Sequence, residues 1–118
     1  MEIVSADILN RLKKPNLNSH KGDNGLVLAV GSSKDYVGAI ALAGLAALRS
    51  GCDLVKIISP EKVAWAINAY SSDLITMKIK NTHFEPPHFN IVKKQMENFD
   101  VLLIGNGVGL DKQTKQFC

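Results

Sequence analysis

The feature that most constrains the fold is a short apolar run enclosed by two glycines. Leu26 to Val30 reads Leu-Val-Leu-Ala-Val, with Gly25 before it and Gly31 after it. Polar and apolar residues do not alternate in this run. That is typical of a strand covered on both faces, as in a parallel sheet. The run therefore indicates an α/β protein.

A helix is expected soon after this strand, over residues 39–48. These residues are mostly small and are apolar nearly all round, so the helix must be buried on more than one side. Gly44 lies inside it, where glycine costs roughly 1 kcal/mol relative to alanine. Close packing of the helix against the sheet would account for this glycine.

Strand and helix patterns alternate along the rest of the chain. Further strands are expected at 54–58, 74–79 and 101–104, and helices from Pro60 onward and at 89–99. The helix that begins near Pro60 is expected to turn four side chains inward: Val63, Ala66, Ile67 and Tyr70. The alternation predicts a Rossmann-like, three-layer α/β/α sandwich with a mostly parallel sheet and right-handed crossovers.

The N-terminal segment predicts one more helix. Ser5 is a good N-cap, and Ile8, Leu9 and Leu12 follow on one face before Pro15 stops the helix. Residues 16–24 are polar and are expected to form a loop.

Composition and charge argue against several classes of protein. Hydrophobic residues make up 46% of the 118-residue chain and charged residues 21%, which are ordinary globular values. The net charge of +3 is scattered, with Lys13-Lys14 and Lys93-Lys94 as the only adjacent basic pairs, so no nucleic-acid partner is expected. The chain shows neither a signal-peptide pattern nor an apolar run of membrane-spanning length, so we expect a cytoplasmic protein without a membrane partner.

The cysteines and histidines do not suggest a metal site. Cys52 and Cys118 are far apart and fit no metal spacing, and Cys52 is expected to be a small packed residue. His83 and His88 stand on either side of Pro86-Pro87 and do not form a convincing pair of ligands. No metal ligand is therefore assigned to the chain.

Two glycine-rich turns are the candidate functional segments. Residues 31–38 and Gly105–Gly109 each follow an expected strand and precede an expected helix, with Asp111 as N-cap of the second helix. Open α/β proteins place ligands at such points, because backbone amides at a helix start can hold a phosphate or a planar ring. The first turn lacks the Gly-Lys-Ser/Thr ending of a Walker A loop, and the second lacks the glycine spacing of the dinucleotide fingerprint. Taken alone, such turns are more often structural.

Other polar residues near these turns have structural interpretations. His20, Lys21 and Asp23 precede the first strand, but no paired base is evident, and Asp23 is expected to cap or brace the turn. Lys34 and Asp35, at the tip of the first turn, are expected to face water.

Four segments, in order and in register, resemble one family. They are His-Lys-Gly-Asp at 20–23, Gly-Ser-Ser-Lys-Asp-Tyr-Val-Gly-Ala at 31–39, Ala-Ala-Leu-Arg-Ser-Gly-Cys-Asp-Leu-Val at 46–55 and Asp-Val-Leu-Leu-Ile-Gly-Asn-Gly-Val-Gly at 100–109. Together they resemble the NAD(P)H-hydrate dehydratases, a branch of the ribokinase-like superfamily that was long classed as carbohydrate kinases. One departure is Asn106, where the family usually has proline.

The resemblance implies a repair reaction that uses ADP or ATP and Mg²⁺. The hydroxyl of hydrated NADH or NADPH would be phosphorylated and then lost, which restores the reduced nicotinamide. By the same resemblance the substrate would lie against five residues of the two turns: Gly38, Ala39, Gly105, Gly107 and Gly109.

The family also implies that much of the machinery lies elsewhere. Its members continue past this length into a half that holds the adenine-nucleotide site and the catalytic aspartate. Residues 1–118 are therefore expected to be the truncated N-terminal part of a single ribokinase-like domain, with no catalytic residue among them. Such a piece is expected to be inactive alone and, with a sheet edge and an apolar helix face uncovered, to form homo-oligomers.

Two other functions stay open on the sequence. The chain could belong to a related small-molecule kinase that phosphorylates a sugar or vitamin precursor, in which case the phosphorylated product would be stable. It could also be an inactive ligand-binding or assembly fragment.

Overall fold

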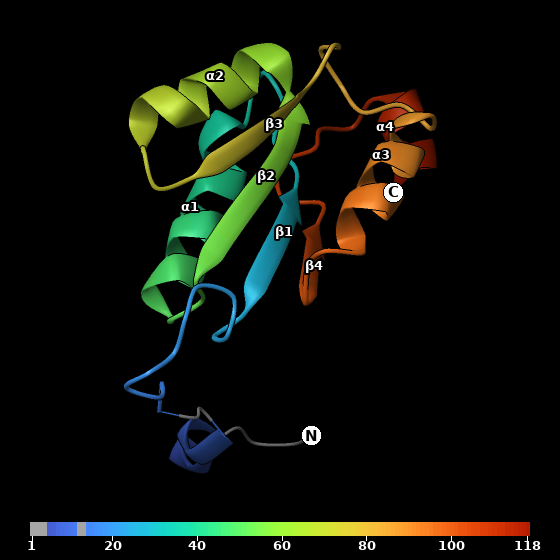
Figure 1. Cartoon of the computed structure of the whole chain (residues 1–118). Helices are drawn as coiled ribbons and strands as arrows, with labels where there is room; N and C mark the ends of the chain where they lie inside the picture. The colour runs from blue at the N-terminus through green and yellow to red at the C-terminus, as the bar shows by residue number, and fades with distance from the viewer. Residues whose placement is uncertain (1–4, 12–13) are drawn as a thin grey trace.

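The computed structural model describes residues 5–11 and 14–118, and the chain from Leu26 onward folds around one parallel sheet, with the N-terminal segment apart from it (Figure 1). Its strands are β1 (Leu26–Val30), β2 (Leu54–Pro60), β3 (Ile75–Ile79) and β4 (Val101–Ile104). The helices are the 3₁₀ helix η1 (Ala6–Arg11), then α1 (Val37–Arg49), α2 (Glu61–Tyr70), α3 (His88–Met96) and α4 (Lys112–Phe117).

The strands pair in the order β3-β2-β1-β4, and every pairing is parallel. Val27 of β1 lies opposite Val55 of β2 on one side and Val101 of β4 on the other. The expected α/β class, the parallel sheet and all four strand positions are thus confirmed. The helices depart from expectation mainly at their ends, since α3 spans 88–96 where 89–99 was expected.

Two apolar clusters cover the opposite faces of the sheet, which makes the three layers. Ala29 and Ile57 belong to the cluster under α1 and α2, while Leu28 and Ile58 belong to the cluster under α3 and α4. Successive residues of a strand point to opposite faces, so each central strand needs apolar residues at every position. This is why β1 shows no alternation.

Gly44 of α1 packs tightly against the sheet, as expected. A Cβ atom at this position would lie 3.0 Å from Leu74 Cδ2 and 3.3 Å from Val55 Cγ1. The cost of glycine in a helix is therefore offset by a close approach of α1 to β2. Cys52 packs as a partly buried residue at the margin of the same cluster.

The outer surfaces of α1 and α2 are less covered than the sequence suggested. Ala66 and Tyr70 were expected to face inward, but both are exposed, and Ala64 is buried instead. Leu42 of α1 is 64% exposed. The expectation of inward Ala66 and Tyr70 was wrong because the buried face of α2 runs through Val63, Ala64 and Ile67.

The N-terminal segment forms the 3₁₀ helix η1 and has no buried residue. Ser5 Oγ accepts a weak hydrogen bond from the amide of Asp7 at 3.4 Å, in the manner of a cap. Ile8 and Leu9 are exposed, whereas Leu12, the third residue of the expected apolar face, and Lys13 lie outside the described residues. Within the described part of the chain, no helix has the length and apolar character needed to cross a membrane.

Carboxylates organise the amino ends of the strands. Asp53 accepts hydrogen bonds from the amides of Gly22 and Asn24 at 2.8 and 2.9 Å and from the Asn24 side chain at 3.0 Å. Asp100 accepts from the amide of Leu26 at 2.8 Å. Asp23 accepts from the amide of His20 at 2.7 Å, so it braces its turn as expected.

Candidate functional site

The two glycine-rich turns lie side by side at the carboxyl ends of β1 and β4. The chain moves from β1 to β2 and then β3 in one direction, and afterwards crosses to the other side of β1 to form β4 (Figure 1). The direction of winding thus reverses between β1 and β4. In open α/β sheets this reversal leaves a crevice between the two loops, which is where ligands bind.

Hydrogen bonds join the two loops directly. The amide of Ser32 donates to the carbonyl oxygen of Asn106 at 2.7 Å, and the amide of Gly105 donates to the carbonyl oxygen of Val30 at 3.0 Å. A Cβ atom at Gly31 would lie 2.5 Å from the carbonyl oxygen of Asn106. Asn106 therefore joins the two loops through its backbone carbonyl, an acceptor that proline at this position would also supply.

Ser32 holds the first loop against the start of α1, a role that sequence reasoning missed. Its φ of +68° lies in the left-handed region, and its side chain is fully buried. Ser32 Oγ donates to the carbonyl oxygen of Val37 at 3.0 Å and accepts from the amide of Ile40 at 3.3 Å. Nothing in the residue type signals this role, because serine is not specific for a left-handed turn.

Ala39 and Gly107, two of the predicted site residues, meet each other. A Cβ atom at Gly107 would lie 2.8 Å from Ala39 Cβ and 2.9 Å from Tyr36 Cβ, and Gly107 itself has a φ of +70°. The small size of both residues thus lets the loop after β4 rest on the first turn of α1. This contact shapes the rim of the crevice.

The other three predicted site residues, Gly109, Gly105 and Gly38, lie in different surroundings. Gly109 lines a cavity of about 390 Å³ between the loops. Gly105 has open space where a Cβ would lie, with a φ of +110° that favours glycine. Gly38 is exposed and lines a separate groove of about 300 Å³ between α1 and α2. The structure therefore brings Ala39 and Gly107 into contact and places Gly109 in the cavity between the loops, while Gly38 lines the groove between α1 and α2.

The cavity beside Gly109 is built from three segments of the chain. The residues that line it come from the loop after β1, the loop after β3 and the loop before α4: Ser33, Lys34, Asp35, Thr82, His83, Val108, Gly109, Leu110 and Asp111. Lys34 and Asp35 are exposed, as expected. The loop after β3 was not recognised as part of the site, because nothing local in it indicates a ligand.

Ser33 carries the most informative polar atom of this cavity. The residue is 7% exposed, and its Oγ has no hydrogen-bond partner among residues 5–11 and 14–118. A Cβ atom placed on Gly109 would lie 3.5 Å from Ser33 Oγ, so the missing side chain at Gly109 leaves room beside the hydroxyl. A buried hydroxyl without a protein partner costs free energy unless a water or a ligand satisfies it, so this one makes the cavity a candidate binding site.

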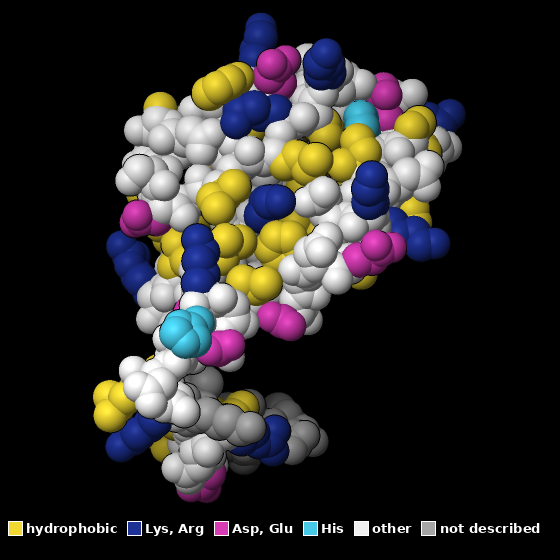
Figure 2. Space-filling view, viewed as in Figure 1, with side chains coloured by type: hydrophobic (Ala, Val, Ile, Leu, Met, Phe, Trp, Pro, Cys, Tyr) yellow, Lys and Arg dark blue, Asp and Glu magenta, His cyan; other side chains and the backbone are white. Residues whose placement is uncertain are grey.

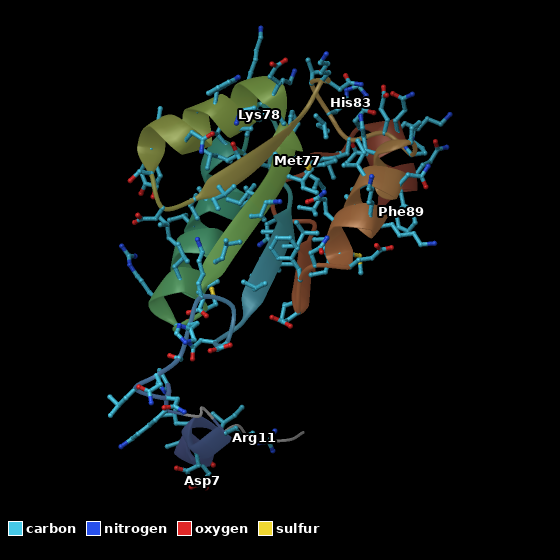
Figure 3. The ribbon with its side chains drawn as sticks, viewed as in Figure 1. Asp7, Arg11, Met77, Lys78, His83 and Phe89 are labelled. Carbon is cyan, nitrogen blue, oxygen red and sulfur yellow. The ribbon has the colours of Figure 1, made fainter. Side chains whose placement is uncertain are left out.

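His83, which also lines this cavity, contacts three side chains on neighbouring segments (Figure 3). One ring nitrogen, Nε2, lies 2.8 Å from Gln113 Oε1, 3.4 Å from Glu85 Oε1 and 3.8 Å from Asp111 Oδ1. Asp111 caps α4 by accepting from the amide of Gln113 at 2.9 Å, as expected. His83 thus joins the segment after β3 to the start of α4.

A larger cavity of about 810 Å³ lies at the opposite end of the sheet. It is lined by the N-terminal segment, by Val27 at the start of β1 and by residues around the end of α1 that include Cys52. Burial raises the pKa of the Cys52 thiol, so this cysteine is protonated at neutral pH and is a poor nucleophile. The crevice between β1 and β4 is therefore the better candidate site.

A family model matches most of the chain. The family model described as NAD(P)H-hydrate dehydratase matches residues 27–118, which include both glycine-rich turns. A bifunctional NAD(P)H-hydrate repair enzyme of Methanocaldococcus jannaschii is 40% identical over 115 residues, covering 98% of this chain and 23% of the relative. An ATP-dependent (S)-NAD(P)H-hydrate dehydratase of Entamoeba histolytica is 32% identical over 113 residues, covering 96% of this chain and 37% of the relative.

Solved structures share the fold. A ribokinase-like superfamily protein of Enterococcus faecalis has a TM-score of 0.76 at 27% identity, covering 96% of this chain and 38% of that one. A hypothetical protein of Streptococcus mutans has the same TM-score and identity, covering 98% of this chain and 40% of that one. The chain thus spans well under half the length of these relatives. Since the family match extends over most of the chain and includes both loops of the crevice, the chain belongs to the NAD(P)H-hydrate dehydratase family, within the ribokinase-like fold.

Proposed function

We propose that this chain forms the substrate-binding part of a nucleotide-dependent NAD(P)H-hydrate dehydratase. The observation that carries the proposal is the unpartnered Ser33 Oγ beside Gly109, in the crevice where the direction of winding reverses. A hydroxyl can both donate and accept, so it suits the carboxamide or the ring hydroxyl of a hydrated nicotinamide. Relatives named as NAD(P)H-hydrate dehydratases make this substrate the natural choice.

In this proposal the residues of the chain bind and orient the substrate. Ser33 Oγ hydrogen-bonds the hydrated ring, and the backbone at Gly109 approaches it because no side chain intervenes. Ala39 and Gly107 contribute indirectly, since their contact fixes the rim against which the ring packs. Gly105 shapes the turn, and Gly38 is assigned no contact with the ring.

The nucleotide would be ATP or ADP, accompanied by Mg²⁺. The described residues include no group of three or more His, Cys, Asp or Glu that could hold a metal ion. The chain's own residues therefore do not fit a resident metal, and we propose that Mg²⁺ enters on the nucleotide's phosphates, a common mode for this ion. No catalytic group is assigned to residues 1–118, and the single domain to which they contribute would supply it from its other half.

A binding measurement tests this proposal. Hydrated NADH should perturb the NMR amide signals of Ser33 and Gly109 in the 118-residue chain, without being dehydrated when ATP and magnesium are added. Gly109→Val should abolish binding, because the added side chain would fill the space beside Ser33 Oγ. Gly22→Val is the matched control, since Gly22 also has a positive φ but has open space around it at the other end of the sheet.

Two outcomes of this measurement would contradict the proposal. If Gly109→Val and Gly22→Val bind hydrated NADH equally well in folded protein, the crevice is not the substrate site. Dehydration of hydrated NADH by residues 1–118 alone would instead show that the catalytic group lies within this chain.

We also propose that the chain self-associates. Leu42 and Tyr70 are 64% and 67% exposed beside the groove between α1 and α2, and Val101 at the β4 edge is 53% exposed. Exposed apolar surface of this kind favours association. Light scattering after size-exclusion chromatography should give a mass above 12.8 kDa, and a monomer at high concentration would contradict the proposal.

A further inference from the structure

A second cavity adjoins the crevice and carries lysine side chains. It measures about 440 Å³ and is lined by Lys34, Lys62 and Lys80, together with Pro60, Glu61, Val63, Asn81 and Thr82. Lys34 and Thr82 also line the cavity beside Gly109. The two cavities therefore adjoin each other at Lys34 and Thr82, and the pair is called the trough.

Among the described residues, the two strand lysines Lys56 and Lys78 are engaged by other side chains, whereas the three lysines of this cavity have no recorded partner. Lys56 Nζ donates to Gln95 Oε1 at 3.1 Å, and Lys78 Nζ donates to Asn68 Oδ1 at 3.0 Å and lies 4.2 Å from the centre of the Trp65 ring. Over residues 5–11 and 14–118, no hydrogen bond or ion pair is recorded for the Nζ atoms of Lys34, Lys62 or Lys80. Their ammonium groups are exposed and free to meet an anion.

The charge around this second cavity is positive. Glu61 is the only carboxylate among its lining residues, against three lysines. Figure 2 shows Lys and Arg side chains gathered at the top of the molecule, where α2 begins and β3 ends. The start of α2 adds the positive end of a helix dipole, part of which the carboxylate of Glu61 in the first turn offsets.

We propose that this second cavity is an oxyanion subsite, which binds the phosphates of the dinucleotide whose hydrated ring lies beside Ser33 and Gly109. The inference rests on the proposed function for the position of the ring. A dinucleotide carries its charge on the pyrophosphate and, in NADPH, also on a phosphate of the adenosine ribose, at a distance from an uncharged ring. The trough repeats this arrangement, with Ser33 Oγ at one end and Lys62 and Lys80 at the other. Lys34 lines both cavities, so it lies where the two parts of the ligand join.

The subsite can be tested with inorganic pyrophosphate and with hydrated NADPH. Pyrophosphate should shift the NMR amide signals of Lys34, Lys62, Lys80 and Thr82, and the shifts should weaken as salt rises, because exposed charges are screened. Hydrated NADPH should displace pyrophosphate and shift Ser33 and Gly109 as well. The double variant Lys62→Gln/Lys80→Gln should weaken hydrated NADPH binding by about tenfold or more, the range of charge-assisted hydrogen bonds.

A matched control removes the same charge elsewhere. Lys93→Gln/Lys94→Gln changes two exposed lysines in the last turn of α3, and should leave the affinity for hydrated NADPH within about twofold of the parent value, since distant surface charges are screened. Equal weakening by both double variants would mean that only net charge matters, and would overturn the subsite. Displacement of pyrophosphate by ATP but not by hydrated NADPH would also overturn it, because the lysines would then serve the nucleotide.

The two proposals fail in different ways. If Lys62→Gln/Lys80→Gln binds hydrated NADPH as tightly as the parent chain, the subsite is wrong while the ring site stands. If pyrophosphate shifts the lysine amides but hydrated NADPH leaves Ser33 and Gly109 unchanged, the proposed function is wrong, and with it the assignment of the anion to this substrate.

Discussion

At the amino ends of the strands, carboxylates satisfy the loop amides, whereas at the carboxyl ends one buried serine hydroxyl has no partner among the described residues. Asp53 accepts three hydrogen bonds from Gly22 and Asn24. At the other end, Ser33 Oγ is buried without a partner in the part of the chain that the structure describes. Both ends contain glycine-rich loops, so glycine content alone does not distinguish them.

The difference shows what to look for in a protein of this kind. Buried polar groups are normally satisfied, because leaving one without a partner costs free energy. A loop whose hydrogen bonds are complete is explained by stability alone. A loop that retains an unpartnered hydroxyl beside a glycine and open space is better explained by a ligand.

The largest expected loss of stability comes from disrupting the contact between the loops after β1 and β4. Gly31→Ala should lower the free energy of unfolding by about 3 kcal/mol, because the new Cβ would lie 2.5 Å from the carbonyl oxygen of Asn106. Gly22→Ala, at the amino ends, meets no atom within 4 Å and suffers only from its φ of +108°, so its loss should be roughly 1–2 kcal/mol. Urea unfolding measures both, and equal losses would show that this contact is not tightly packed.

Enlarging Ala39 should have the next largest effect. Ala39→Leu would push against Gly107 and should cost about 1–3 kcal/mol, the usual range for overpacking. It should also weaken binding of hydrated NADH, because the rim of the crevice moves. Gly38→Ala, with open space around its Cβ position, is the control and should leave stability unchanged or slightly higher. A stable Ala39→Leu variant would mean that the loop after β4 shifts freely.

Asp53 provides a prediction for the amino ends that depends on pH. Hydrogen bonds from the backbone and side chain of Asn24, and from the amide of Gly22, lower the pKa of Asp53 below its usual value. The carboxylate therefore stabilises the fold above its unfolded pKa of about 3.9, and this stabilisation is lost as pH falls through the lower folded pKa.

Asp53→Asn should thus be less stable than the parent chain near neutral pH, and the difference should shrink as the solution is acidified. Unfolding free energies measured from about pH 7 down to about pH 3 would follow this change. Asp73→Asn is the control, because Asp73 is exposed and its carboxylate accepts no recorded hydrogen bond within the described residues. A difference that does not vary with pH would remove the carboxylate's charge from the explanation.

The smallest effect on stability is expected at Ser33. Ser33→Ala removes a hydroxyl that has no partner, so the free energy of unfolding should change by less than about 0.5 kcal/mol or increase slightly. Its neighbour is the matched control, since Ser32→Ala removes two hydrogen bonds and should cost about 1–3 kcal/mol. Equal losses in the two variants would show that Ser33 is a structural residue like Ser32.

Much of the fold could be predicted because its signals are local. The run Leu26–Val30 is apolar at every position, since both faces of β1 are covered, and the sequence placed this strand correctly. Gly44 and Asp111 were also interpreted correctly, from a glycine within a helix and an aspartate before one. The exposure of Ala66 and Tyr70 was not foreseen, because apolar spacing on a short helix does not say how far the neighbouring helix extends over it.

The sequence by itself determined the order of strands and helices, the two-sided cover of the sheet and the two glycine-rich turns that carry the family resemblance. These depend on periodicity and on residues close together in the chain. Only the tertiary structure decided that Ala39 rests against Gly107, that Ser33 Oγ is left without a partner, and that Lys34, Lys62 and Lys80 line one cavity. The reason is that these contacts join segments far apart in sequence. Their meeting depends on the order β3-β2-β1-β4, which the sequence pattern does not specify.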